Sequence, residues 1–132
     1  MSEVKRTERG WVGHFICASQ CRFRRNTLLE YKDQKIVVST VGNMINAEGL
    51  PDTVGTDGRR YETRVFEAHV EGAYLDANAS REVDYNGVWE IRAINYEDLP
   101  KDVDTAANNM HEHVVGIVRE EMLDKSIVFI NE

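Results

Sequence analysis

The sequence predicts an α+β domain: an antiparallel sheet of five or six strands with a C-terminal helix packed on one face. Two patterns carry this prediction. Up to about residue 94, β-branched and aromatic residues alternate with polar ones between turn residues, and after residue 104 apolar residues recur every three or four positions. The length of 132 residues is that of one domain. We therefore expect a single domain over 1–132, with 1–9 as a flexible lead-in.

The first half of the chain is expected to supply three strands. Residues 11–18 are apolar on both alternating faces, which suits a central strand. The β-branched run from Ile36 to Val41 predicts a strand most clearly. In order, we expect a strand at 11–18, a connection at 19–25, strands at 27–31 and 35–41 joined as a hairpin through 32–34, and a long loop at 43–58.

The second half is expected to continue the sheet before the helix begins. Asn86-Gly87 lies between β-forming residues, which is typical of a type I′ hairpin turn. We therefore expect the strand that follows this turn to pair with the strand that precedes it. In order, the expected elements are a strand at 61–70, a strand from 72 to 79 or beyond, a strand at 88–94 and a linker at 95–104.

The period of the apolar residues changes after the linker. Helical spacing predicts a helix from Thr105 to about Asp124, with Asp104 as its N-cap. The short apolar run at 126–130 either extends this helix or forms an edge strand. The apolar residues at helical spacing are Ala107, Met110, Val114, Ile117, Val118 and Met122.

Composition and charge exclude several classes of protein. A net charge of −7 makes a poor general binder of DNA or RNA, because such binding needs a basic surface. No apolar run approaches the roughly 20 residues of a membrane helix. Residues 1–10 are polar and charged, unlike a secretory signal, and the two cysteines suit a reducing compartment. We therefore expect a cytoplasmic protein with no membrane partner and no nucleic-acid partner.

Positive charge gathers near the start of the chain. Residues 1–35 carry a net charge of +4, and residues 36–132 carry −11. The concentrated basic segment is 22–25 (RFRR), whose guanidinium groups suit phosphate and whose aromatic ring suits a base. For the basic residues, the competing interpretation is ordinary surface ion pairing. A second basic group follows the long loop and consists of Arg59, Arg60 and Arg64.

The first turns of the predicted helix are unusually polar. Thr105, Asn108 and Asn109 lie there, and two adjacent asparagines are unfavourable inside a helix. The N-terminus of a helix attracts anions, and asparagine side chains can bond phosphate or ribose. These residues therefore predict either a ligand site or a simple capping turn.

Metal and catalytic sites find little support in the sequence. Cys17 and Cys21 have the spacing of half a zinc site, but His111 and His113 are too close together for the usual second half. With His14 they are more simply packing residues, so we expect no metal and no cofactor. No known catalytic motif is present, and a hydrolase using His111 and Glu112 is the weakest alternative.

Four segments resemble a known family of small phage and prophage proteins. They are residues 10–18 (GWVGHFICA), 21–27 (CRFRRNT), 37–42 (VVSTVG) and 107–112 (ANNMHE). The family is the first type of Thoeris anti-defence protein. The resemblance implies a small α+β homo-oligomer, a dimer or larger. It also implies ligand sites near the subunit interface, where cyclic ADP-ribose isomers made by TIR-domain immune enzymes are bound without cleavage. Some members also hold cyclic oligonucleotides.

Residue chemistry and resemblance converge on one expectation. The protein is expected to sequester a cyclic nucleotide immune signal in the infected bacterial cytoplasm, with arginines on phosphates and aromatic rings on the base. The alternative is an acidic inhibitor that binds a host nucleic-acid enzyme through the negative charge of residues 36–132. The expected ligand-binding residues are Phe15, Phe23, Arg24, Arg25, Arg60, Trp89, Thr105, Asn108 and Asn109.

Overall fold

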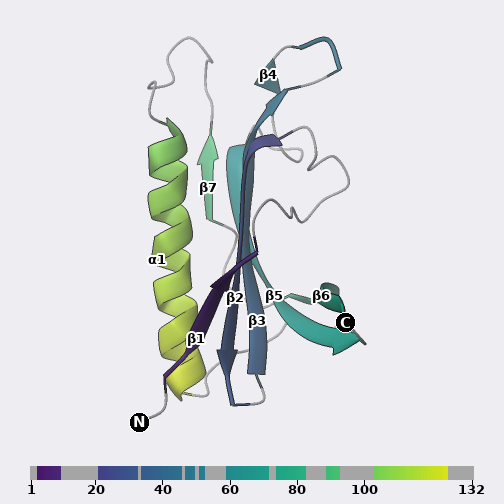
Figure 1. The fold of residues 1–132 in the computed structure, drawn as a ribbon. Coiled ribbons are helices and arrows are strands. Elements are labelled where there is room, and N and C mark those ends of the chain that lie inside the picture. The colour runs from purple at the N-terminus through teal and green to yellow at the C-terminus, as the bar shows by residue number, and fades with distance from the viewer. Residues whose placement is uncertain are drawn as a thin grey trace.

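The fold is seen in a computed structural model, in which one helix lies along one face of an antiparallel sheet (Figure 1). The α+β class and the position of the helix at the end of the chain are as expected. Among the described residues no helix is long and apolar enough to cross a membrane. The structure describes residues 3–9, 21–32, 34–45, 47–49, 51–52, 59–71, 74–82, 89–92 and 103–124.

The sheet has seven strands within the described residues, so the expected number of five or six is not confirmed. Its main path runs in the order β1-β2-β3-β5-β6, while β4 pairs with β3 and β7 pairs with β5, all antiparallel. The strands are β1 (Lys5–Glu8), β2 (Cys21–Tyr31), β3 (Gln34–Ile45), β4 (Pro51–Asp52), β5 (Arg59–Glu71), β6 (Tyr74–Glu82) and β7 (Trp89–Arg92).

Two short strands that the sequence did not predict account for part of the difference between the expected and the observed number of strands. The flexible lead-in expected at 1–9 is wrong for β1, which pairs with β2 from Lys5 opposite Glu30 to Glu8 opposite Thr27. All four side chains of β1 are exposed, so its sequence carries no apolar alternation that would reveal a strand. The loop expected at 43–58 is also interrupted, because β3 continues to Ile45 and pairs there with β4.

The hairpin of β2 and β3 is confirmed, with Tyr31 opposite Gln34 and a positive φ of 56° at Lys32 in the turn. The connection expected at 19–25 is wrong from Cys21 onward, because β2 begins there and Arg25 pairs with Thr40. Three consecutive polar residues, Arg24, Arg25 and Asn26, interrupt the apolar alternation and obscure this part of the strand in the sequence.

Both β6 and β7 pair with β5, so the expected pairing of the strand at 88–94 with the strand before it is wrong. The register places β6 against 66–71 of β5 and β7 against 59–63. At 13 residues, β5 is long enough to hold both strands along one edge. The expected turn at Asn86-Gly87, the strand at 11–18, the linker over 95–102 and the run at 126–130 lie outside the described residues.

The helix α1 runs from Val103 to Asp124, which confirms the expected end at Asp124. Its start is two residues earlier than expected, so Asp104 lies inside the first turn rather than at the N-cap. The apolar positions that face the sheet and are fully buried are Ala107, Val114, Val118 and Met122.

The interface between α1 and the sheet is layered along the helix. A large apolar cluster at one end joins Val114, Val118 and Met122 to strand residues such as Val38 and Val65. Each such side chain contributes about 1.5–3 kcal/mol on burial. A smaller cluster at the other end of the interface joins Tyr61, Ala107, Phe23 and Met110. Between these two clusters the facing side chains are polar, and this polar layer positions the candidate site.

Candidate functional site

The polar layer begins as a row across three strands. Arg25 of β2 lies opposite Thr40 of β3, and Thr40 lies opposite Thr63 of β5, so the three side chains share the face under α1. Thr40 and Thr63 are fully buried, and His111 of α1 is fully buried against them. A buried imidazole needs partners for both ring nitrogens, and Thr27 and Thr40 supply them.

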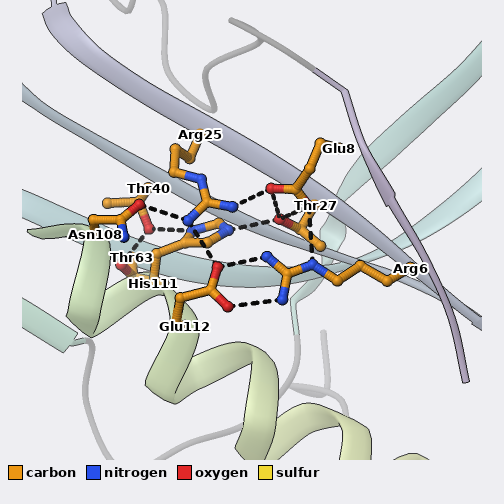
Figure 2. A network of polar contacts seen from close by, with 9 residues as sticks. All are labelled: Arg6, Glu8, Arg25, Thr27, Thr40, Thr63, Asn108, His111 and Glu112. Atoms are coloured by element: carbon orange, nitrogen blue, oxygen red, sulfur yellow. Dashed lines mark hydrogen bonds and ion pairs between the residues drawn. The ribbon is translucent and has the colours of Figure 1, made fainter.

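A directed chain of hydrogen bonds runs through His111 (Figure 2). The Glu8 carboxylate can only accept, so the Thr27 hydroxyl donates to it at 2.8 Å to Oε2. Thr27 Oγ1 must then accept from Nε2–H of His111 at 2.7 Å. Nδ1 of His111 accepts from Thr40 Oγ1 at 2.7 Å, and Thr40 accepts from Thr63 at 2.6 Å. The carboxylate therefore sets the tautomer of the histidine.

This environment keeps His111 neutral. Burial, followed by the nearby positive charge of Arg25, lowers the pKa of His111 to about 4. Because the imidazole is fully buried and both nitrogens are engaged, it has no open position for a substrate. The hydrolase alternative thus loses its general base in this conformation.

Next to the buried chain, four charged side chains form a closed ring of alternating sign (Figure 2). Arg6 binds both oxygens of Glu112, at 2.7 and 2.5 Å, and its Nε donates to Glu8 at 3.1 Å. Arg25 donates to Glu112 Oε2 at 2.7 Å and also to Glu8. A second bond from Nη1 of Arg25 reaches Oδ1 of Asn108 at 2.7 Å. The ring joins β1, β2 and α1.

The ring favours the charged forms of its members. Hydrogen bonds from Arg6 and then Arg25, against the effect of burial, lower the pKa of Glu112 to about 2. Burial by itself would raise the pKa of Glu8, but hydrogen bonds from Arg6, Arg25 and Thr27 outweigh it and lower that pKa. Hydrogen bonds to Glu112 and Glu8 raise the pKa of Arg6 above its ordinary value. At neutral pH the ring carries two positive and two negative charges.

Three of the expected ligand-binding residues lie close together. Arg25 and Asn108 form the 2.7 Å hydrogen bond, although they come from different elements. Phe23 lies two residues before Arg25, on the same face of β2, and meets the ring of Tyr61 edge-on with centroids 5.8 Å apart. One edge of the polar layer is therefore bordered by aromatic rings.

The other expected residues lie on the opposite face of the strand, are exposed on the helix, or have side chains outside the described part. Arg24 lies on the opposite face of β2 from Arg25, because side chains alternate along a strand. Thr105 and Asn109 are exposed on α1. Arg60 and Trp89 lie in β5 and β7, but their side chains are outside the described part, as is all of Phe15.

Among the residues of the charged ring and of the buried hydrogen-bonded chain, Arg25 alone belongs to the ligand-binding residues that the sequence predicts. Arg6 and Glu8 fall in the segment expected as a lead-in, and the sequence predicts roles for His111 and Glu112 only in an unsupported zinc site and in the weakest alternative, the hydrolase. One pattern could have revealed the buried chain, namely threonines at helix-facing positions of otherwise apolar strands. These are Thr27, Thr40 and Thr63.

A metal ion does not fit these groups well. Ligand atoms of Glu8, His111 and Glu112 lie within 4.8 Å of one another. However, both carboxylates are bound by guanidinium groups, and both nitrogens of His111 are hydrogen-bonded. A cation there would have to displace Arg6 and Arg25. Of the residues weighed for zinc, Cys21 is buried near Val41, and His14 and Cys17 lie outside the described residues.

Comparisons with protein-family models, with curated proteins and with solved structures find no match for this chain.

Proposed function

We propose that this protein binds and sequesters a cyclic nucleotide, in the manner of a phage anti-defence protein that holds a cyclic ADP-ribose isomer without cleaving it. One observation supports this proposal above the others. Arg25 and Thr27, neighbours on the helix-facing side of β2, already hold an anionic group, the carboxylate of Glu8. A guanidinium and a hydroxyl directed at one oxyanion form a donor set that also suits a phosphate oxygen.

The groups around Arg25 suit the rest of such a ligand. Asn108 is within 2.7 Å of the guanidinium and offers an amide to ribose or phosphate. Phe23 is half-buried, two residues before Arg25 on the same face of β2, and offers an aromatic ring to a base. In this proposal the pyrophosphate lies at Arg25, and the base extends toward Phe23.

Binding without turnover is consistent with the same geometry. In the described part of the chain, the hydroxyl that donates to the unprotonated ring nitrogen of His111 is that of Thr40, 2.7 Å from Nδ1, and it is fully buried. A nucleophile must reach its substrate, so this pair supports a structural role. We also propose that the working form is a homodimer or larger, with the ligand near the subunit interface.

A thermal-shift titration with cyclic ADP-ribose isomers tests the proposal. Ligand at 100 times its dissociation constant adds about 2.7 kcal/mol, a rise of several degrees in Tm. We expect this rise for the parent protein, with intact ligand recovered afterwards. Arg25→Gln should lose the rise relative to its own ligand-free Tm. The matched control is Arg22→Gln, an exposed arginine of the same strand, which should keep it.

Two results would contradict the proposal in different ways. An equal rise in Arg25→Gln and the parent would place the ligand elsewhere. No rise with any isomer, in the parent or the control, would exclude the sponge function and favour the acidic protein-binding inhibitor. A salt-sensitive complex with a basic host enzyme would then be the expected finding.

A further inference from the structure

Glu8 lies at the end of the edge strand β1 and reaches across to β2. Its Oε1 contacts Arg25 and lies 3.0 Å from the hydroxyl of Thr27, while Oε2 contacts Thr27 at 2.8 Å and Arg6 at 3.1 Å. The Glu8 side chain is 45% exposed, whereas Thr27 beneath it is fully buried. The carboxylate therefore covers these donors from the solvent side.

We propose that Glu8 is a built-in competitor of the ligand, whose carboxylate must leave Arg25 and Thr27 before a phosphate group can use those donors. This inference rests on the proposed function and assigns a regulation to the same site. The Nη2 donor of Arg25 that faces Glu8 and the hydroxyl of Thr27 cannot serve both anions at once, so a phosphate oxygen that uses these donors must replace an oxygen of Glu8. The apparent affinity of the site for a phosphate is thus lower than its intrinsic affinity, because an internal anion occupies the same donors.

The charge balance of the ring favours such an exchange. With Glu8 in place, Arg6, Arg25, Glu8 and Glu112 carry no net charge. When Glu8 swings into solvent, the remaining three groups carry one net positive charge, which attracts an anion. Arg25 keeps its bonds to Asn108 and Glu112, so the guanidinium stays oriented with Nη2 available.

Glu8 is better suited than Glu112 to leave the ring. Glu112 is held through both oxygens by Arg6 and again by Arg25, and it projects from a 22-residue helix. Glu8 projects from a strand of four residues whose side chains are all exposed. Movement of a short edge element disturbs few buried contacts, so Glu8 can move while Glu112 continues to hold Arg6 and Arg25.

Calorimetric titration with inorganic pyrophosphate tests the inference in four proteins. We expect Glu8→Gln to bind about tenfold more tightly than the parent, because a charge-assisted contact no longer has to be broken. Glu3→Gln is the matched control, since it removes an exposed carboxylate of the same terminal segment, and its dissociation constant should stay within about twofold. Adding Arg25→Gln to Glu8→Gln should abolish the gain.

Each outcome decides between the two proposals. Equal affinities of Glu8→Gln and parent overturn the competitor and leave the binding function standing, as does an equal gain in Glu3→Gln. Binding of pyrophosphate by Glu8→Gln but not by the parent supports the role of Glu8 as a competitor. If neither the parent nor Glu8→Gln binds pyrophosphate, and the parent binds no cyclic ADP-ribose isomer, the binding function fails as well. If Glu8→Gln does not fold, Glu8→Asp replaces it in the experiment. Glu8→Asp keeps the negative charge but shortens the reach of the carboxylate to Arg25, so we again expect tighter binding of pyrophosphate than in the parent. Binding equal to that of the parent would overturn the inference.

Discussion

Asn108 of α1 accepts a 2.7 Å hydrogen bond from the guanidinium of Arg25 in β2, across a separation of 83 residues in the sequence. This contact ties the start of the helix to the sheet beside the aromatic pair of Phe23 and Tyr61. It also explains how a polar residue can be placed inside a helix that disfavours it. Asn109, the next residue, is exposed.

Asn108→Ala should weaken binding of a cyclic ADP-ribose isomer by about tenfold, because the mutation removes an amide that orients Arg25 and faces the proposed ligand. Asn109→Ala is the matched control and should bind like the parent. Calorimetric titration of both variants measures the difference. Equal binding by Asn108→Ala and the parent would show that the helix start takes no part in the site.

His111→Ala should destabilise the protein by roughly 2–4 kcal/mol, because it opens a cavity and leaves the hydroxyls of Thr27 and Thr40 without their shared partner. Urea unfolding measures the loss. His113→Ala alters an exposed residue two positions later, so its cost should stay within about 0.5 kcal/mol. Equal losses of stability in the two variants would contradict the buried chain of hydrogen bonds through His111.

Stability should fall as the pH falls from 7.5 to 5. The pKa of His111 is about 4 in the folded protein and about 6.5 in an unfolded chain. The unfolded state therefore binds the extra proton in this window, and the folded state loses roughly 2 kcal/mol by pH 5. Glu112, with a pKa of about 2, adds a further loss only below about pH 4.5.

Urea midpoints at pH 7.5, 6 and 5 measure this dependence. His111→Gln should lack the loss assigned to His111, while the other three histidines remain in both proteins. The difference between the two pH profiles therefore isolates one group. Parallel profiles would mean that His111 is not held neutral by burial.

The direction of the hydrogen-bonded chain predicts unequal losses of stability when two of its threonines are replaced by valine. Thr40→Val leaves both Nδ1 of His111 and the Thr63 hydroxyl without a partner, at about 2 kcal/mol. Thr63→Val removes the last donor of the chain and should cost about 0.5–1 kcal/mol. Both changes preserve volume, so each serves as the control for the other in urea unfolding. A larger cost for Thr63→Val would reverse the assigned direction of the chain.

Arg6→Ala should cost less than about 1 kcal/mol, because its partners Glu8 and Glu112 are 45% and 41% exposed. Its clearer effect should be faster amide hydrogen exchange in β1, which the ring holds against α1. Lys5→Ala on the same strand is the matched control and should leave exchange unchanged. Protection of β1 that is unaffected by Arg6→Ala would show that backbone pairing alone retains the strand.

Local patterns predicted the elements whose signals are local. The helix over 105–124 follows from apolar residues at helical spacing, and the hairpin of β2 and β3 follows from a β-branched run next to a short turn. Arg25 and Asn108 were recognised as ligand-type residues from their chemistry. The sequence does not predict the contact between these two residues, because neither position carries any indication of its partner.

The sequence by itself determined the fold class, the helix and the central hairpin, because hydrophobic periodicity depends on neighbours a few residues apart. Only the tertiary structure decided that β6 and β7 share β5 and that a polar layer separates two apolar clusters. The ring joins Arg6 to Glu112 across 106 residues and Arg25 to Glu8 across 17. Side-chain partners at such separations are chosen by the packing of the helix on the sheet, a long-range effect that leaves no periodic trace in the sequence.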